Sequence, residues 1–132
     1  MKARIRGGQA PKGTVVVSGA KNSATRLLAA ACISDGEVRL NNFPTQLVDA
    51  QHKIRFLRAL GVDISIDENL ESLSINASSL NAVPLASYDY PIRTTYLLVA
   101  AQIKQSGVAY IPYPGGCKIG SRGYDLHIKV WE

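Results

Sequence analysis

Cysteine is scarce in this sequence, since only Cys32 and Cys117 occur among its 132 residues. The two are not spaced as a CxxC pair, and no pair of histidines accompanies them, which argues against a structural zinc site. Two cysteines in a cytosolic chain are expected to stay reduced. Both thiols are therefore predicted to be free.

Long apolar runs are missing too. The longest run, residues 27–33, is far too short to cross a bilayer. The basic N-terminus, residues 1–8, is followed by Gln9, Pro11 and Lys12 rather than by an apolar stretch, so no secretory signal is expected. These absences predict a cytoplasmic protein.

Charge is moderate and scattered. Charged residues make up 19% of the chain and apolar residues 46%, an ordinary composition for a single globular domain. The net charge of +5 suits an anionic partner such as nucleic acid, an acidic surface or a phosphorylated metabolite. No block of five like charges occurs, which weakens the interpretation as a nucleic-acid-binding module.

The residue pattern predicts alternating strands and helices. Strands are predicted at residues 14–18, 38–42, 62–66, 73–75 and 108–111, and helices at residues 22–33, 47–60, 92–105 and 124–132. The β-branched run at 14–18 is typical of a buried strand. Gly61 lies where a left-handed helix cap belongs, and the polar residues 67–69 are expected to close a hairpin.

The order of these elements predicts an α/β (α+β) fold built from a repeated unit. The first six elements give β-α-β-α-β-β over about residues 14–77, and residues 88–132 resemble the start of a second copy. The last helix has no stop signal, and the second unit lacks its closing elements. We therefore interpret the chain as an incomplete domain of a larger protein.

The first candidate site follows the first predicted strand, in the segment Ser18-Gly19-Ala20-Lys21-Asn22. Backbone N–H groups at a helix N-terminus attract anions, and Lys21 adds a positive charge while Asn22 adds amide donors. Such a segment can bind a phosphate or a carboxylate. A capped turn with a solvated lysine fits the same residues, and spacing alone favours that simpler interpretation. The Walker pattern GxxxxGK[ST] is absent.

The second candidate is the glycine-rich segment 114–122 around Cys117. Lys118 and Arg122 are cations, which stabilise a thiolate and lower the pKa of a nearby cysteine. A reactive thiol and an inert surface cysteine fit this segment about equally well. Cys32 differs, because it lies on an apolar helix and is expected to act as a small hydrophobe.

Arg93 and Asp125 are weaker candidates. An arginine in the first turn of a helix opposes the helix dipole unless an anion lies nearby, although an exposed side chain with its head in water is equally simple. Asp125 can accept hydrogen bonds from a base or sugar, or can cap its own helix. His127 is expected to be structural, and His52 is expected to face solvent.

Together these motifs resemble the UDP-N-acetylglucosamine enolpyruvyl transferases. SGAKN at 18–22, PGGCxIGxR at 114–122 and DLH at 125–127 match that family in order and separation. The resemblance implies a two-domain enzyme of six β-α-β-α-β-β units, with the active site between the domains, of which this chain covers roughly the first third. The missing remainder carries the aspartate general base and a further substrate-binding arginine, so this chain is expected to be inactive alone.

The resemblance also implies a reaction. The family transfers the enolpyruvyl group of phosphoenolpyruvate to the 3-hydroxyl of UDP-N-acetylglucosamine and releases phosphate, which is the first committed step of peptidoglycan synthesis. It implies these two small-molecule substrates, no cofactor, no metal, and neither nucleic acid nor membrane as a partner.

The roles implied by the resemblance fall on individual residues. Lys21 and Asn22 match the pair that binds phosphoenolpyruvate. Cys117 matches the loop cysteine that donates a proton to the enolpyruvyl methylene, forms a covalent adduct with phosphoenolpyruvate and is the target of the antibiotic fosfomycin. Arg122 matches an arginine that contacts the bound substrates, and Arg93 matches an arginine at the nucleotide-sugar site.

The uridine end of the site departs from the family. Segment 122–126 matches the part that holds uridine and consists of Arg122, Gly123, Tyr124, Asp125 and Leu126. The family usually has Arg-Pro-(Ile/Val)-Asp-Leu there. The rigid proline is lost and a tyrosine is gained, which leaves open a relative acting on another nucleotide or nucleotide-sugar.

Overall fold

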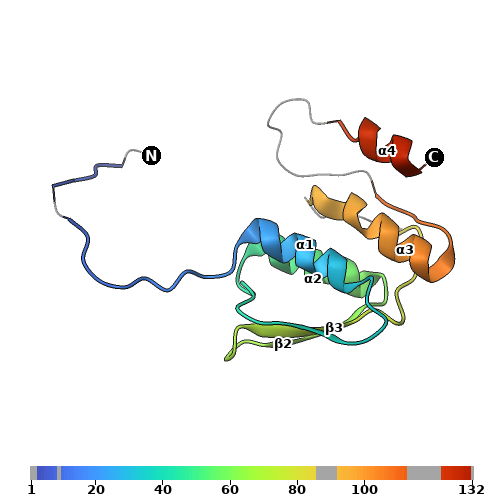
Figure 1. Cartoon of the computed structure of the whole chain (residues 1–132), viewed down its shortest axis with the longest axis horizontal. Helices are drawn as coiled ribbons and strands as arrows, with labels where there is room; N and C mark the ends of the chain where they lie inside the picture. Colours follow the sequence, from blue (N-terminus) through green and yellow to red (C-terminus); the bar gives the residue numbers. More distant parts are fainter. Residues whose placement is uncertain (1–2, 9, 86–91, 113–122, 132) are drawn as a thin grey trace.

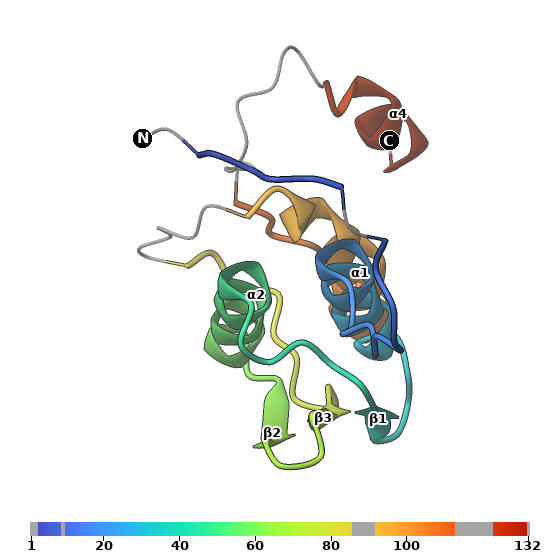
Figure 2. The same ribbon diagram turned by 90° about the vertical axis from the view of Figure 1, so that its left-hand side faces the viewer.

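The computed structural model of this chain describes residues 3–8, 10–85, 92–112 and 123–131. Its elements are α1 (Lys21–Ala31), β1 (Val38–Leu40), α2 (Val48–Ala59), β2 (Asp63–Asp67), β3 (Ser72–Asn76), the 3₁₀ helix η1 (Thr94–Leu98), α3 (Val99–Ser106) and α4 (Asp125–Trp131) (Figure 1). Helices α1 and α2 lie over one face of the sheet (Figure 2). Helices beside a small antiparallel sheet confirm the predicted mixed fold class.

The sheet has three antiparallel strands in the order β1-β3-β2. Ile75 of the central strand pairs with Val38 on one side and Ile64 on the other. Ile75 is fully buried and Leu73 nearly so, because this face of β3 packs beneath the helices. The predicted hairpin between β2 and β3 is confirmed, and Asp67 Oδ1 closes its turn by accepting two backbone N–H bonds, each 3.1 Å long.

The core lies between the sheet and the helices. Leu28 of α1 and Phe56 and Leu57 of α2 are fully buried. Burial of a large apolar side chain contributes about 1.5–3 kcal/mol, so this layer is the main source of stability. Helix α2 ends as predicted, with Gly61 at a φ of +88° and its N–H donating to the carbonyl of Arg58. No helix in the described part of the chain is both long and apolar enough to cross a membrane.

The predicted helix at 92–105 is present but divided. It begins as the 3₁₀ helix η1 and continues as α3, which ends at Gly107 with a φ of +73°. The buried Gln102 joins α3 to its surroundings, because its amide donates to the carbonyl of Asn81 and accepts from the N–H of Tyr110. Helix α4 confirms the helix predicted from residue 124 onwards.

Two predicted strands are wrong. Residues 14–18 form no strand, and Val15, Val16 and Val17 are 84%, 92% and 77% exposed. A strand needs a neighbour for its hydrogen bonds and a cover for its side chains, and no strand in the described ranges pairs with this segment. Residues 108–111 also form no strand, since the N–H of Tyr110 bonds to a glutamine side chain instead of a strand.

The start of α1 differs from the prediction in detail. The helix begins at Lys21, one residue before the predicted start, and Ala20 occupies the capping position. His52 is half-buried, with a buried Nδ1, instead of facing solvent. Both differences arise from tertiary packing, which places the turn before α1 and the flank of α2 against other parts of the chain.

Candidate functional site

The N-terminal ends of α1, α2 and η1 lie at the same end of the molecule. They are at the left in Figure 1 and face the viewer in Figure 2. Helix N-termini carry partial positive charge, so three that begin at one end favour anions there. Two predicted site residues, Lys21 and Arg93, lie at the starts of α1 and η1.

Lys21 forms an ion pair with Asp49 in the first turn of α2. The Nζ and Oδ1 atoms are 3.3 Å apart, and the two side chains are 57% and 43% exposed. Ion pairs with this exposure contribute less than about 1 kcal/mol, because water and salt screen them. A bound anion can therefore replace Asp49 as the partner of Lys21 at little energetic cost.

The first turn of α1 has no capping side chain. Ala20 offers no oxygen to the first N–H groups of the helix, and no acidic residue lies in the first turn. Asn22 is exposed, and its carbonyl accepts a 2.8 Å hydrogen bond from Arg26 Nη1. An exposed helix start without its own carboxylate is suited to an external anion.

Gly19 fixes where this helix start lies. A Cβ atom at this position would be 2.3 Å from the carbonyl oxygen of Asn42 and 2.7 Å from Cδ of Pro44. Only glycine permits this approach of the two backbones. The glycine of the SGAKN segment is thus required for packing against residues 42–44.

Arg93 and Tyr124, which belong to separate sequence motifs, are in contact. The guanidinium carbon of Arg93 lies 4.9 Å from the centre of the Tyr124 ring, a cation–π geometry. The hydroxyl of Tyr124 donates to the carbonyl of Arg93 over 3.5 Å. Sequence reasoning assigned both residues to the nucleotide-sugar end of the site but contained no signal for their direct contact.

Aromatic contacts attach α4 to η1. The Tyr96 ring lies 4.7 Å from His127 and 5.1 Å from Tyr124, in edge-to-face arrangements. This is consistent with the predicted structural role of His127. The cluster holds Tyr124 beside Arg93.

The other described residues of the predicted uridine segment, at 123, 125 and 126, are exposed. Leu126 is 78% exposed, and Gly123 and Asp125 are exposed as well. A Cβ atom on Gly123 would lie 2.5 Å from Oδ2 of Asp125, so the absent side chain leaves room for this carboxylate. The proline usual in the family would force Asp125 to move.

Cys117 and Arg122 lie outside the described residues, so their predicted roles remain predictions. Cys32 is 1% exposed, and its thiol donates to the carbonyl of Leu28 over 3.2 Å. Burial raises the pKa of Cys32 to about 11, against a smaller, opposite effect of the charge on Lys53. This agrees with the prediction that Cys32 acts as a small buried hydrophobe.

Lys53 is a buried residue that sequence reasoning missed. It has no exposed surface, and its Nζ donates a 2.8 Å hydrogen bond to the carbonyl of Thr94. Burial lowers the pKa of Lys53 to about 7. A signal was present, because Lys53 lies three residues after Ala50 and four before Leu57, on the apolar face of the predicted helix.

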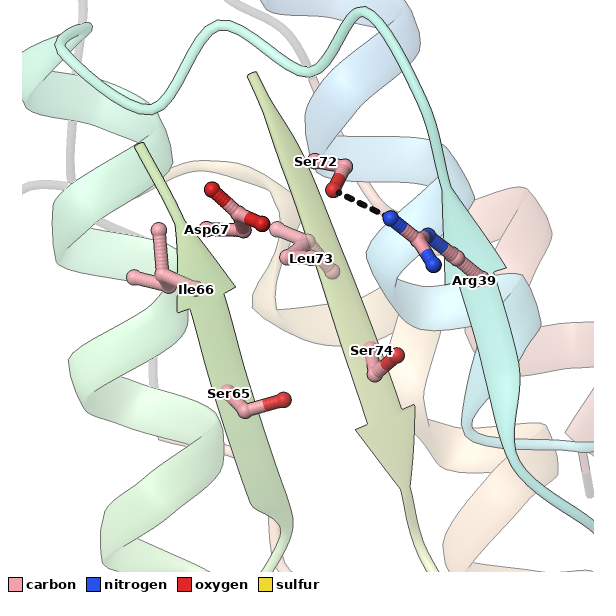
Figure 3. Close-up of a pocket in the computed structure, with 7 residues that line it drawn as sticks. All are labelled: Arg39, Ser65, Ile66, Asp67, Ser72, Leu73 and Ser74. Carbon is pink, nitrogen blue, oxygen red and sulfur yellow. Dashed lines mark hydrogen bonds between the residues drawn. The ribbon is translucent and has the colours of Figure 1, made fainter. Parts of the chain in front are cut away.

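A polar pocket of about 220 Å³ lies on the sheet face turned away from α1 and α2 (Figure 3). Arg39 extends from β1 toward β3 and donates to Ser72 Oγ over 3.3 Å, and Ser65 and Ser74 line the floor of the pocket. None of the predicted site residues lines this pocket. Among the described residues, no group of three histidine, cysteine or carboxylate side chains is placed to hold a metal ion.

Lys21 and Arg93 lie at helix starts within an α+β unit, and comparison with known proteins identifies the class of this unit. The sequence profile of the EPSP synthase (3-phosphoshikimate 1-carboxyvinyltransferase) family matches residues 5–132. The chain therefore belongs to this family of enolpyruvyl (carboxyvinyl) transferases.

Particular relatives narrow the class. The chain is 36% identical over 129 residues to UDP-N-acetylglucosamine 1-carboxyvinyltransferase 3 of Caldanaerobacter subterraneus, covering 97% of this chain and 30% of that protein. It is 36% identical over 138 residues to UDP-N-acetylglucosamine 1-carboxyvinyltransferase of Rhodospirillum centenum, covering 97% of this chain and 32% of that protein. The chain thus spans about a third of the length of these curated relatives.

A solved structure supports the same fold. The enolpyruvyl transferase NikO from Streptomyces tendae matches with a TM-score of 0.64 and 30% sequence identity. The match covers 78% of this chain and 24% of that one. The described elements are thus those of an enolpyruvyl transferase fragment.

Proposed function

We propose that this chain is part of a UDP-N-acetylglucosamine 1-carboxyvinyltransferase that acts in the cytoplasm in peptidoglycan synthesis. The enzyme transfers the enolpyruvyl group of phosphoenolpyruvate to the 3-hydroxyl of UDP-N-acetylglucosamine and releases phosphate. One observation carries the proposal: Lys21 and Arg93 stand at helix starts at one end of the molecule. Both substrates are anions, and both cations are placed where helix dipoles add to their charge.

Lys21 and Asn22 bind phosphoenolpyruvate in this proposal. The uncapped N–H groups of α1 and the Asn22 amide donate to the phosphate or carboxylate, and Lys21 exchanges Asp49 for the ligand. Cys117 donates a proton to the methylene carbon as the sugar hydroxyl oxygen bonds to the neighbouring carbon and its proton passes to the general base in the remainder of the enzyme. Loss of phosphate and of a proton from the new methyl group then restores the double bond, and Arg122 neutralises substrate charge. Arg93, Tyr124, Asp125 and Leu126, with Gly123 giving Asp125 room, hold the nucleotide end.

Lys21→Met is expected to weaken phosphoenolpyruvate binding to the chain by about tenfold, because one charge-assisted contact to the anion is lost. Calorimetric titration measures this. Lys12→Met is the matched control, since Lys12 is also exposed and precedes the same turn, and it should bind like the wild type. Equal affinity of wild type and Lys21→Met would contradict the assignment of Lys21.

Asp49→Asn is expected to have the opposite effect. Removing the carboxylate 3.3 Å from Lys21 Nζ frees the ammonium for the ligand and removes a repelling charge. Phosphoenolpyruvate should bind about two- to fivefold more tightly at low salt, and the gain should shrink as salt screens the lost repulsion. Weaker binding by this variant would show that Asp49 orients Lys21 rather than competing for it.

We also propose that the chain does not turn over alone. It spans about a third of its curated relatives, and in the family the general base lies in the remainder. A phosphate-release assay with both substrates should give no signal above background. Clear turnover by the purified chain would refute this part of the proposal.

A second candidate is an enolpyruvyl transferase that acts on another nucleotide or nucleotide-sugar. It is favoured by the stacking of Arg93 on Tyr124, because the family usually has Ile or Val at the position of this tyrosine and proline at the position of Gly123. Comparison of UDP-N-acetylglucosamine with UMP separates the two. Tighter binding of UMP would favour the second candidate.

A further inference from the structure

Lys53 spans the core from α2 to the start of η1. Its side chain is fully buried, and its only described hydrogen bond goes to the carbonyl of Thr94, the first residue of η1. The ring of Phe56, one turn along α2, lies 5.4 Å from the ammonium. The hydroxyl oxygen of Thr94 is itself buried, and no described residue bonds to it.

Thr94 lies in a turn in which three successive residues, 93–95, form hydrogen bonds to three different segments of the chain. The carbonyl of Arg93 accepts from Tyr124, and the carbonyl of Thr94 accepts from Lys53. The buried hydroxyl of Thr95 donates to the carbonyl of Pro112 over 3.3 Å. Of these three hydrogen bonds, the one from Lys53 is the shortest and is shielded from water, so it limits movement of the turn most strongly.

We propose that Lys53 is a positioning residue, which holds the carbonyl of Thr94 so that Arg93 stays stacked on Tyr124 and faces the nucleotide end of the site. The inference rests on the proposed role of Arg93. The inference goes beyond that role, because it assigns a function to a core residue that does not contact substrate.

The chemistry of Lys53 supports this assignment. A buried ammonium is unfavourable, and burial lowers the pKa of Lys53 to about 7. The titratable group that interacts with Lys53 is the thiol of Cys32, directly after α1, which is neutral at pH 7 and offers no compensating charge. A methionine or leucine would fill the same space without this penalty. The hydrogen bond to the Thr94 carbonyl therefore explains why an amine is present at this position.

The test compares Lys53→Met with the control Lys104→Met. Lys104 also donates to a backbone carbonyl, that of Ile33 over 2.7 Å, but it belongs to α3 and pairs with Asp35. Two readouts are taken on the 132-residue chain: the ring-current shift of the Arg93 side chain caused by Tyr124, and the affinity for UDP-N-acetylglucosamine. Lys53→Gln, which keeps a shorter amide donor, is measured alongside in case the methionine variant loses its fold.

Lys53→Met is expected to lose most of the Arg93 ring-current shift and to bind UDP-N-acetylglucosamine about fivefold more weakly. Lys53→Gln should lie between it and the wild type, and Lys104→Met should match the wild type. An unchanged Arg93 shift in a folded Lys53 variant overturns the inference, as does an equal loss in Lys104→Met. If Arg93→Ala binds the nucleotide-sugar as tightly as the wild type, the proposed role of Arg93 fails, while the ring-current shift still decides whether Lys53 positions it.

Discussion

Lys53→Met is expected to stabilise the chain by about 2 kcal/mol at pH 6 to 7. Burial lowers the pKa of Lys53 from 10.5 to about 7, so folding at neutral pH must either bury a charge or release a proton. Each pKa unit corresponds to about 1.4 kcal/mol, and the lost hydrogen bond to Thr94 offsets about 1–3 kcal/mol of the gain. The same substitution that is expected to release Arg93 should therefore make the fold more stable.

The pH dependence has a defined sign. Between pH 7 and pH 10.5 the unfolded chain holds a proton on Lys53 that the folded chain has lost, so the free energy of unfolding rises with pH in this window. Cys32 acts in the opposite direction above pH 9, because burial raises its pKa from 9.0 to about 11 and the unfolded thiol ionises first. Between pH 7 and 9 Lys53 acts without the opposing effect of Cys32, and the free energy of unfolding of the wild type should rise by about 2 kcal/mol.

Urea denaturation at pH 6, 7, 8 and 9 measures both effects. The wild type should gain stability across the series relative to Lys53→Met, and the difference between the two proteins should shrink as pH rises. A difference independent of pH would mean that Lys53 titrates near its ordinary pKa. A variant less stable than the wild type at pH 6 would mean that the hydrogen bond to Thr94 outweighs the burial of charge.

Gly19→Ala is expected to destabilise the chain by about 3 kcal/mol. The added methyl group would lie 2.3 Å from the carbonyl oxygen of Asn42, and backbone on both sides must shift to admit it. Because α1 starts two residues later, the shift moves Lys21 and Asn22 away from their places. Phosphoenolpyruvate binding should fall together with stability.

Gly36→Ala is the matched control for this substitution. A Cβ atom at Gly36 meets nothing within 4 Å, so its free energy of unfolding should stay within about 0.5 kcal/mol of the wild type. Thermal or urea unfolding of the two variants provides the comparison. Equal stabilities for Gly19→Ala and Gly36→Ala would contradict the packing of the turn against residues 42–44.

Local signals predicted the elements that form from local contacts. Gly61 and Gly107 end α2 and α3 in left-handed conformations, as glycines following an apolar periodic segment do. The polar turn opening at Asp67 predicted the hairpin. The valines at 15–17 led to the wrong prediction of a strand at 14–18. Residues with β-branched side chains favour a strand only where a partner strand is present, and the described chain supplies none for this segment.

The site was predicted only in part. Motif residues gave Lys21 and Arg93, and the structure places both at helix starts at one end of the molecule. The pairing of Lys21 with Asp49, the stacking of Arg93 on Tyr124 and the reach of Lys53 to Thr94 join segments 28 to 41 residues apart. Contacts of that kind depend on how elements pack, which a single sequence pattern does not specify.

The most direct test maps both ligands onto the ¹⁵N-labelled chain by titration with phosphoenolpyruvate and UDP-N-acetylglucosamine. The account predicts saturable amide shifts at the starts of α1 and η1, around Lys21 and Arg93, and at Tyr124. The account would be contradicted if the shifts centred instead on the polar pocket at Arg39 and Ser74, or if no shifts appeared at high ligand concentration.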